Sequence, residues 1–400
     1  MGHTASALLM SGERRLMSSQ TDEVSANLRK KSGGGATAKS VLRDGAIVLA
    51  VTALLFGLFE FGIRLIAPQD VDTTFISGNS LGLRDDLLGH LNRPNSHTVV
   101  RAPEYEVEYK VSAQGFRDEA TYSPVAAPGV TRVLLLGDSF AFGTGTDYEG
   151  IWPVVLERNL RAQGHQVEVI KAGVPAFDTR SEVLFLEQLM ERYSPDITIL
   201  TFLPNDLFTN RPIATSKDAT PSTGEEDLRK TGVVTTGDKK SDLHSLTLVK
   251  RLLMMSDRLY ASLYLMTQRR EIFAFPPTDT LTRQIDLTKD LFLRAQDLCR
   301  SEGCELMVLS LPQQFQLFAD GIDGIDPAYI DRTFAQMAEE RGIQWIALLP
   351  ILAEAYRVHG QDLYFRYDGH LNPAGNAVVG ATLANAVSDW LSVHEAAHHP

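Results

Sequence analysis

Five short apolar runs alternate with helical segments in residues 131–391, and this alternation constrains the fold more than any other feature. The runs have the length of buried strands and occupy residues 132–137, 166–173, 196–204, 305–312 and 343–349. Apolar residues recur at helical spacing in the segments between and after them. Strands that alternate with helices form a parallel sheet through right-handed crossovers, with helices on both faces. The sequence therefore predicts an α/β fold of three layers.

The alternation is interrupted once, at about residues 207–280. Residues 207–245 are polar, whereas residues 245–266 carry apolar residues at helical spacing. We interpret this block as an insertion after the third strand. Its methionine and aromatic side chains are expected to pack into the core, and a lid that binds lipid is the alternative interpretation.

A long apolar run, residues 46–66, lies near the N-terminus. As a helix it would be roughly 30 Å long at about 1.5 Å per residue, which is enough to cross the hydrocarbon core of a membrane. Glu60 interrupts the run, and Arg64 follows one turn later, so the two side chains can pair. We predict a disordered tail at residues 1–44 and a transmembrane helix at residues 45–67.

Charges on either side of this run predict its orientation. Lys and Arg are frequent before it, and Asp residues follow it, so the positive-inside rule places the N-terminus in the cytoplasm. Everything after Pro68 would then be exported, to the periplasm or the cell exterior. A cleaved signal peptide is the alternative, but the tail is long for one and no small-residue cleavage site is evident. Glu60 also leaves open a contact with a membrane protein partner, while the net charge of -12 disfavours nucleic acid.

Residues 68–130 contain short alternating segments bounded by Pro and Gly, which indicates a strand-rich preface that packs on the catalytic domain at residues 131–392. Later in the chain, Cys299 and Cys304 flank a predicted tight turn between a helical segment and an apolar strand. Such a turn could bring the two thiols within bridging distance, so we predict a disulfide, with two free thiols as the alternative. This spacing without further cysteines is a poor match to a zinc site.

Polar residues and glycine gather where the predicted strands stop. Ligands of open parallel sheets bind outside the carboxyl ends of the strands, so these positions are the expected site. They are Asp138 and Ser139 after the first strand, Gly173 at the end of the second, Asn205 and Asp206 after the third, and Asp368 and His370 before the last helix. A hydroxyl nucleophile, a bare backbone donor, an amide donor and an imidazole beside a carboxylate together indicate acyl transfer.

At these residues the chain resembles the SGNH/GDSL hydrolase family over residues 131–390. "GDSF" matches the first family block, Gly173 the second, Asn205-Asp206 the third and "DGHLNPAGN" the fifth. The motif "SAQGFRDE" before the first strand is similar to membrane-anchored bacterial members and to relatives of polysaccharide O-acetyltransferases. The resemblance implies a flavodoxin-like parallel sheet and a catalytic triad of Ser139, His370 and Asp368.

The resemblance also implies an oxyanion hole formed by Ser139, Gly173 and Asn205, and a reaction that needs no cofactor and no metal. Two positions depart from the family pattern: Pro204 stands where the third block has Gly, and only Gly369 separates Asp368 from His370. A flexible Gly369 would let both side chains turn toward one site.

Three functions follow from these observations. The first is a membrane-anchored serine esterase that acts on O-acyl esters, acetyl esters above all, of an envelope glycan or lipid. The second is an O-acetyltransferase with the same site. The third is a non-catalytic anchored subunit that retains the fold for assembly.

Overall fold

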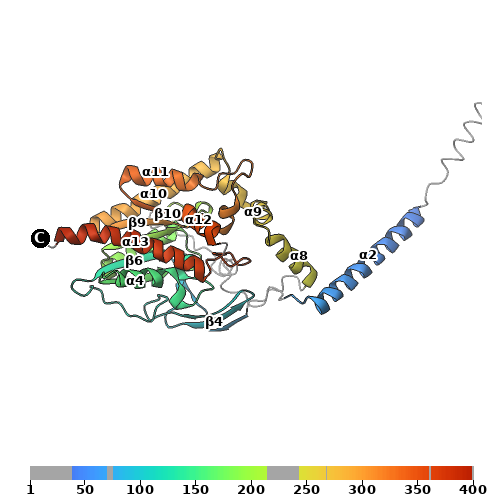
Figure 1. The fold of residues 1–400 in the computed structure, drawn as a ribbon, viewed down its shortest axis with the longest axis horizontal. Coiled ribbons are helices and arrows are strands. Elements are labelled where there is room, and N and C mark those ends of the chain that lie inside the picture. The colour runs from blue at the N-terminus through green and yellow to red at the C-terminus, as the bar shows by residue number, and fades with distance from the viewer. Residues whose placement is uncertain (1–37, 70–74, 214–242, 267, 360–361, 399–400) are drawn as a thin grey trace, which may run out of the picture. The chain divides into compact units, whose positions relative to one another are not determined.

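The computed structural model describes residues 38–69, 75–213, 243–266, 268–359 and 362–398 (Figure 1). The chain divides into two compact units, Met1–Pro68 and Gln69–Pro400. Most of the predicted N-terminal tail therefore lies outside the described residues.

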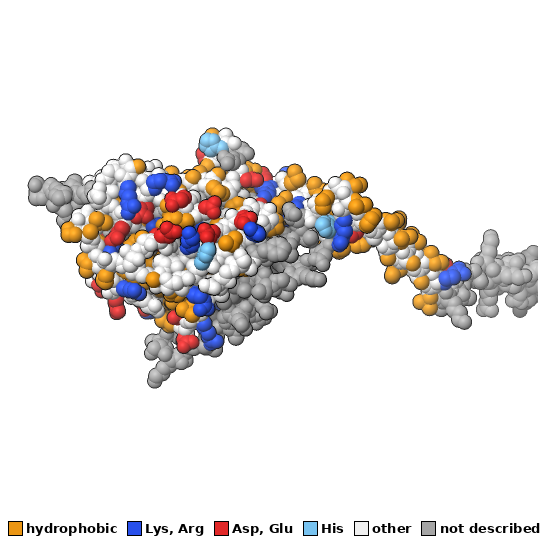
Figure 2. All heavy atoms as spheres, turned by 90° about the horizontal axis from the view of Figure 1, so that it is seen from below, with side chains coloured by type: hydrophobic (Ala, Val, Ile, Leu, Met, Phe, Trp, Pro, Cys, Tyr) orange, Lys and Arg blue, Asp and Glu red, His pale blue; other side chains and the backbone are white. Residues whose placement is uncertain are grey.

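The first unit contains one long helix, α2 (Ala38–Ile66). Within it, the apolar span Ser40–Ile66 has 27 residues and is long and apolar enough to cross a membrane. Hydrophobic side chains cover the visible surface of α2 in Figure 2, and Leu49 and Ile66 are among the exposed ones. Arg64 Nε donates to Glu60 Oε1 at 2.8 Å, so the predicted contact one turn apart is present. An apolar surface on all sides is typical of a helix surrounded by lipid.

The second unit is built on a five-stranded parallel sheet in the order β10-β9-β8-β6-β7. Its strands are β6 (Thr131–Gly137), β7 (Val167–Gly173), β8 (Ile197–Phe202), β9 (Glu305–Ser310) and β10 (Gln344–Ala347). The side chains of β8 are buried along its whole length, as expected for a central strand covered on both faces. This strand order is the flavodoxin-like order, which confirms the predicted fold class.

Helices cover both faces of this sheet (Figure 1). One apolar core packs α4 (Trp152–Ala162), α12 (Leu349–His359) and α13 (Pro373–His398) against the sheet. The other core packs α5 (Thr179–Tyr193), α10 (Asp279–Glu302) and α11 (Tyr329–Arg341). Short elements lie in the connections between the strands and the long helices: α3 (Ser139–Phe142), η1 (Tyr148–Gly150), α6 (Asp206–Thr209), η2 (Gln268–Phe273) and η3 (Gln314–Phe318).

The segment before β6 contains the strands that its alternating pattern predicts. A three-stranded antiparallel sheet joins β1 (Phe75–Gly78), β4 (His97–Ala102) and β5 (Tyr105–Lys110). A separate hairpin joins β2 (Gly82–Asp85) and β3 (Gly89–Asn92). Val100, Val107 and Tyr109 of the larger sheet form a small apolar cluster with Phe142 of α3. This segment therefore packs directly on the element that follows β6.

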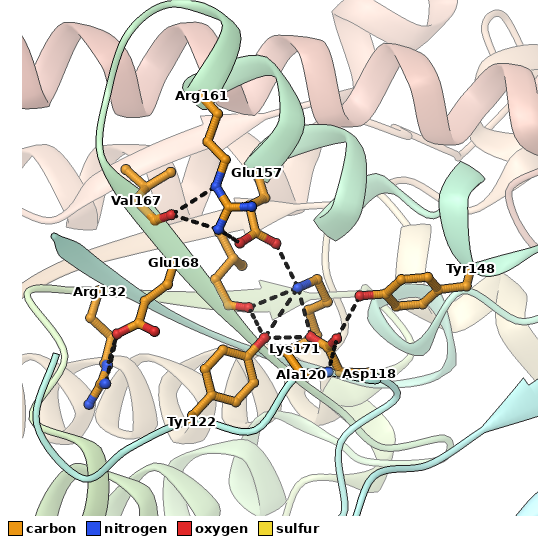
Figure 3. Close-up of polar contacts among 11 residues, drawn as sticks. Asp118, Ala120, Tyr122, Arg132, Tyr148, Glu157, Arg161, Val167, Glu168 and Lys171 are labelled. Carbon is orange, nitrogen blue, oxygen red and sulfur yellow. Dashed lines mark hydrogen bonds and ion pairs between the residues drawn. The ribbon is translucent and has the colours of Figure 1, made fainter. Parts of the chain in front are cut away.

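A buried ion cluster joins the same segment to the central sheet (Figure 3). Lys171 Nζ of β7 donates at 2.8 Å to Asp118 Oδ2 and at 2.8 Å to Glu157 Oε2 of α4. The hydroxyls of Tyr122 and Tyr148 also donate to Asp118. Burial opposes ionisation of Asp118, but the charge and hydrogen bond of Lys171 keep the pKa of Asp118 below its ordinary value. The charged groups of this cluster are therefore shielded from solvent and are stabilised by one another instead of by water.

We expect Lys171→Met to destabilise the protein by about 3–5 kcal/mol, because it leaves the buried Asp118 without its cation, while Glu157 keeps only its pair with Arg161. Thermal or urea unfolding of the full chain measures this loss. Lys289→Met is the matched control, since Lys289 forms a 3.5 Å pair with Asp286, which is largely exposed. Such surface pairs contribute about 0–1 kcal/mol. Equal effects of the two substitutions would contradict a stabilising role of the cluster.

The insertion contributes α8 (His244–Met254) and α9 (Asp257–Leu265), while residues 214–242 lie outside the described part. The expected core packing holds for part of α9, where Tyr260 and Leu265 are buried. It is wrong for Met255 and Met266, which are exposed, and the leucines Leu246 and Leu252 of α8 are exposed as well. Helical spacing of apolar residues predicts an apolar helix face. It does not tell whether other residues of this chain cover that face.

The two cysteines are free thiols in the structure, so the predicted disulfide is absent from it. Gly303 ends α10 in the left-handed conformation, and the backbone N–H of Cys304 donates to Cys299 O at 2.9 Å. The turn places the thiols side by side, but both lie in the apolar core, where free cysteine packs as a small hydrophobe. A hydrogen bond with Cys304 and burial raise the pKa of Cys299.

Candidate active site

Ser139 lies where β6 leaves the core. The carboxylate of Asp138 accepts a hydrogen bond from Phe140 N at 2.8 Å and so caps α3, whose first residue is Ser139. Burial raises the pKa of Asp138 to about 6. The cap fixes the backbone at Ser139 and turns the chain sharply from strand to helix. Such a turn presents a hydroxyl beyond the carboxyl end of the sheet.

His370 and Asp368 lie in the loop between α12 and α13 and form a hydrogen-bonded series with Ser139. His370 Nε2 lies 2.7 Å from Ser139 Oγ, and His370 Nδ1 lies 2.5 Å from Asp368 Oδ1. Gly369 has a φ of 88°, a conformation that costs glycine little, and it allows both flanking side chains to face the same place. The short Asp-Gly-His spacing is therefore compatible with this series.

The electrostatics of the series suit a proton acceptor oriented by a carboxylate. Burial alone would lower the pKa of His370, but the hydrogen bond and charge of Asp368 raise it above its ordinary value. Burial would raise the pKa of Asp368, yet the charge of His370 and hydrogen bonds from His370 and Tyr105 keep it low. Asp368 therefore remains ionised beside an imidazole that can accept a proton from Ser139.

Gly173 ends β7 and Asn205 follows β8, and these two strands flank β6 in the sheet. A side chain at Gly173 would meet the backbone of Phe142 at 2.4 Å, so only glycine fits against α3. Asn205 directly precedes α6, and its Oδ1 accepts a hydrogen bond from Gln313 Nε2 at 2.7 Å. This bond directs the other end of the amide, which carries the N–H donors, away from Gln313.

Asp206, one of the polar residues at the predicted strand ends, is buried in the first turn of α6. Its Oδ2 accepts a hydrogen bond from Thr179 Oγ1 of α5 at 2.9 Å, so it joins α6 to α5. Burial and nearby carboxylates raise the pKa of Asp206 and of Glu182 well above their ordinary values. Within the described ranges, no group of His, Cys, Asp and Glu side chains is placed to hold a metal ion.

Some polar residues around the site were not among the predicted ones. Gln313 follows the end of β9, so the rule that ligands meet the strand ends could have found it. Glu104, Tyr105 and Arg117 belong to the preface, and only the motif "GFRD" marks one of them in the sequence. Their contacts with the site join residues far apart along the chain.

The C-terminal part of the chain, which contains Asp368 and His370, is similar to a known protein family. Residues 275–399 match the family model described as the SGNH hydrolase-like domain of the acetyltransferase AlgX. Residues 275–399 therefore resemble an SGNH hydrolase-like domain. The matched residues include Asp368 and His370, whereas Ser139 lies before them. The resemblance predicted from the sequence is thus confirmed for residues 275–399.

The chain is also similar to individual proteins, each over a short stretch or at low sequence identity. An arylesterase of Vibrio mimicus is 30% identical over 81 residues, which are 20% of this chain and 40% of that protein. An acetyl xylan esterase structure has a TM-score of 0.39 and 13% identity, covering 64% of this chain and 99% of the other. The psychrotrophic esterase EstA of Pseudoalteromonas sp. has a TM-score of 0.39 and 12% identity, covering 66% and 99%.

Asn205 offers a direct test of the amide at this site. If its N–H groups bind a developing oxyanion, Asn205→Ala should lower kcat by about a hundredfold to a thousandfold with little change in KM. Hydrolysis of p-nitrophenyl acetate by the full chain measures both constants. Asn385→Ala is the control, because Asn385 is exposed on α13 and should be silent. An unchanged kcat for Asn205→Ala would exclude Asn205 from the oxyanion hole.

Proposed function

We propose that this protein is a membrane-anchored serine esterase that cleaves O-acyl esters, acetyl esters above all, of an envelope glycan or lipid. The hydrogen-bonded series Ser139–His370–Asp368 carries the proposal, since it joins a nucleophile, a base and an orienting carboxylate at the carboxyl end of the sheet. The preference for acetyl rests on the family model, which describes an acetyltransferase.

In the proposed reaction, Ser139 Oγ attacks the ester carbonyl carbon while its proton passes to His370 Nε2. Asp368 holds the imidazole in the required tautomer and stabilises the imidazolium. The backbone N–H groups of Ser139 and Gly173 and the amide of Asn205 donate hydrogen bonds to the oxyanion. The intermediate collapses to an acyl-serine, and the alcohol leaves with the proton held by His370.

The fate of the acyl group separates two activities. Water, deprotonated by His370, would attack the acyl-serine and release a carboxylic acid, which makes the protein an esterase. A sugar hydroxyl in place of water would yield a new ester, which makes it an O-acetyltransferase. The first half-reaction is the same in both activities. The family model supports the transferase as the alternative, because its description names an acetyltransferase.

The proposed anchor is α2, with the N-terminus in the cytoplasm and the catalytic domain exported. The length and apolar surface of α2 support an anchor, and the Lys and Arg residues that precede the apolar run support this orientation. A reporter fused after Pro400 that is active only in an exported compartment should give signal. A signal from a cytoplasmic reporter at the same position would overturn the orientation.

The experiment that tests the function uses the full chain in detergent with an acetylated oligosaccharide, with and without an unacetylated sugar acceptor. An esterase releases acetate in both conditions. A transferase releases little acetate and forms acetylated acceptor, which mass spectrometry detects. Absence of both products, together with no hydrolysis of p-nitrophenyl acetate by folded protein, would reject catalysis and favour a non-catalytic anchored subunit.

A further inference from the structure

The preface and the proposed catalytic residues meet through a set of hydrogen bonds. The loop that contains Asp368 and His370, the helix that begins at Ser139 and the end of β7 at Gly173 are each hydrogen-bonded by a residue from the segment before β6. We propose that the segment 75–122 positions these loops for catalysis, with Glu104 and Tyr105 as positioning residues for Asp368 and His370. This inference rests on the proposed function.

Glu104 and Tyr105 come from the hairpin between β4 and β5. Glu104 Oε2 accepts hydrogen bonds from the backbone N–H groups of Tyr367 at 2.9 Å and Asp368 at 2.8 Å. Tyr105 Oη donates to Asp368 Oδ2 at 3.1 Å, while His370 contacts the other oxygen, Oδ1. Both the backbone and the carboxylate of Asp368 are therefore held, and the carboxylate cannot rotate away from His370 without breaking a bond.

Packing keeps the hairpin in place on the loop. The ring of Tyr105 lies 5.0 Å from the ring of Phe365, centroid to centroid. A side chain at Gly145 would approach the Phe365 ring to 2.7 Å and the Tyr105 ring to 2.9 Å, so the backbone passes close to both rings. The hydrogen bonds of Glu104 and Tyr105 are thus supported by aromatic contacts that resist displacement of the hairpin.

Arg117, the third residue of "GFRD", contacts the end of α3 opposite Ser139. Its NH1 group donates at 2.7 Å to Phe142 O and to Gly143 O, and its NH2 group donates at 2.6 Å to Thr146 O. The side chain is buried, and burial lowers the pKa of Arg117 to about 10, which still leaves it charged at neutral pH. The guanidinium therefore fixes the end of α3, whose first residue is Ser139.

Asn92 completes the set at the end of β7. Its Nδ2 donates to Gly173 O at 2.8 Å and to Gly115 O at 3.2 Å. The preface thus contacts α3, which begins at Ser139, the end of β7 at Gly173, and the acid–base loop, which contains Asp368 and His370. Reacting groups must be held to within a fraction of an ångström, and a misplacement of about 1 Å can cost about a hundredfold in rate. A segment that touches all three parts is in a position to supply that accuracy.

Tyr105→Phe is the gentlest test, because it removes only the hydroxyl and keeps the packed ring. In the full chain with p-nitrophenyl acetate, we expect kcat to fall about tenfold, as for the loss of one hydrogen bond to a charged acceptor, with KM and the melting temperature unchanged. Glu104→Ala should lower kcat by about tenfold or more. Glu104→Gln should restore most of that loss, because its amide oxygen can accept from the same two N–H groups.

Glu106→Ala is the matched control on the same hairpin. Glu106 is half exposed and forms a 2.8 Å ion pair with Arg101. Among the described residues it has no hydrogen bond or ion pair with Asp368 or His370, so kcat should not change. Wild-type kcat in Tyr105→Phe and Glu104→Ala, while Ser139→Ala is inactive, would overturn the inference. A raised KM at constant kcat in Tyr105→Phe would also overturn it, since that result means substrate contact. If the wild type itself shows no activity, the proposed function fails instead.

Discussion

Ser139→Ala should lower kcat for ester hydrolysis by about 10⁴-fold to 10⁶-fold, because the covalent route is lost and only binding and the oxyanion hole remain. The hydroxyl has one close partner on the acid–base loop, His370 Nε2 at 2.7 Å, so no second base is expected to take its place. Long incubations with p-nitrophenyl acetate, followed by measurement of the released p-nitrophenol, give the residual rate. The melting temperature should stay close to that of the wild type, since the substitution removes one part-buried hydroxyl.

His370→Ala should lose about as much as Ser139→Ala, and the double variant hardly more. Residues that act as one unit are strongly non-additive, because either substitution already abolishes the shared step. His359→Ala serves as the control, since His359 ends α12 away from the described contacts of Ser139. Multiplying losses in the double variant would contradict a shared proton transfer.

Asp368→Asn should lower kcat/KM by about a thousandfold or more, because an amide at this position can hold the imidazole in the wrong tautomer. It should also move the pH profile. Asp368 raises the pKa of His370, so in the wild type kcat/KM should rise with pH through a value above that of ordinary histidine. Without the carboxylate the imidazolium is less stable, the pKa of His370 falls, and the acid limb moves to lower pH.

Asp362→Asn is the matched control for this substitution. Asp362 lies in the same loop, half exposed, 3.7 Å from Arg366, and should change neither the rate nor the profile. A loss of less than about tenfold in Asp368→Asn, with an unmoved acid limb, would mean that Asp368 does not orient His370. Another group, or none, would then hold the imidazole.

The central fold could be predicted because its signals are local. Apolar runs of strand length, separated by helical spacing, predicted the parallel sheet, and the sheet contains β6 to β10 in the flavodoxin-like order. The position of Ser139 also follows from local sequence, since "VLLLGDS" marks a buried strand that ends in a turn. The rule that ligands meet the strand ends selected Gly173 and Asn205 by the same reasoning.

The contacts around these residues could not be predicted in the same way. Tyr105 and Asp368 are 263 positions apart, and no periodicity links a hairpin turn to a distant loop. The exposed face of α8 shows the converse limit, since its spacing is that of a buried helix. The free thiols of Cys299 and Cys304 show that closeness in a turn does not decide whether a bond forms.

Labelling with a fluorophosphonate probe tests the central claim most directly, because it needs no knowledge of the natural substrate. Ser139 Oγ attacks phosphorus, its proton passes to His370, and fluoride leaves, so the serine stays covalently modified. Peptide mapping of the full chain should find the label on Ser139, and His370→Ala should abolish it. Folded wild-type protein that takes up no label, or takes it up equally in Ser139→Ala, would contradict the proposed nucleophile.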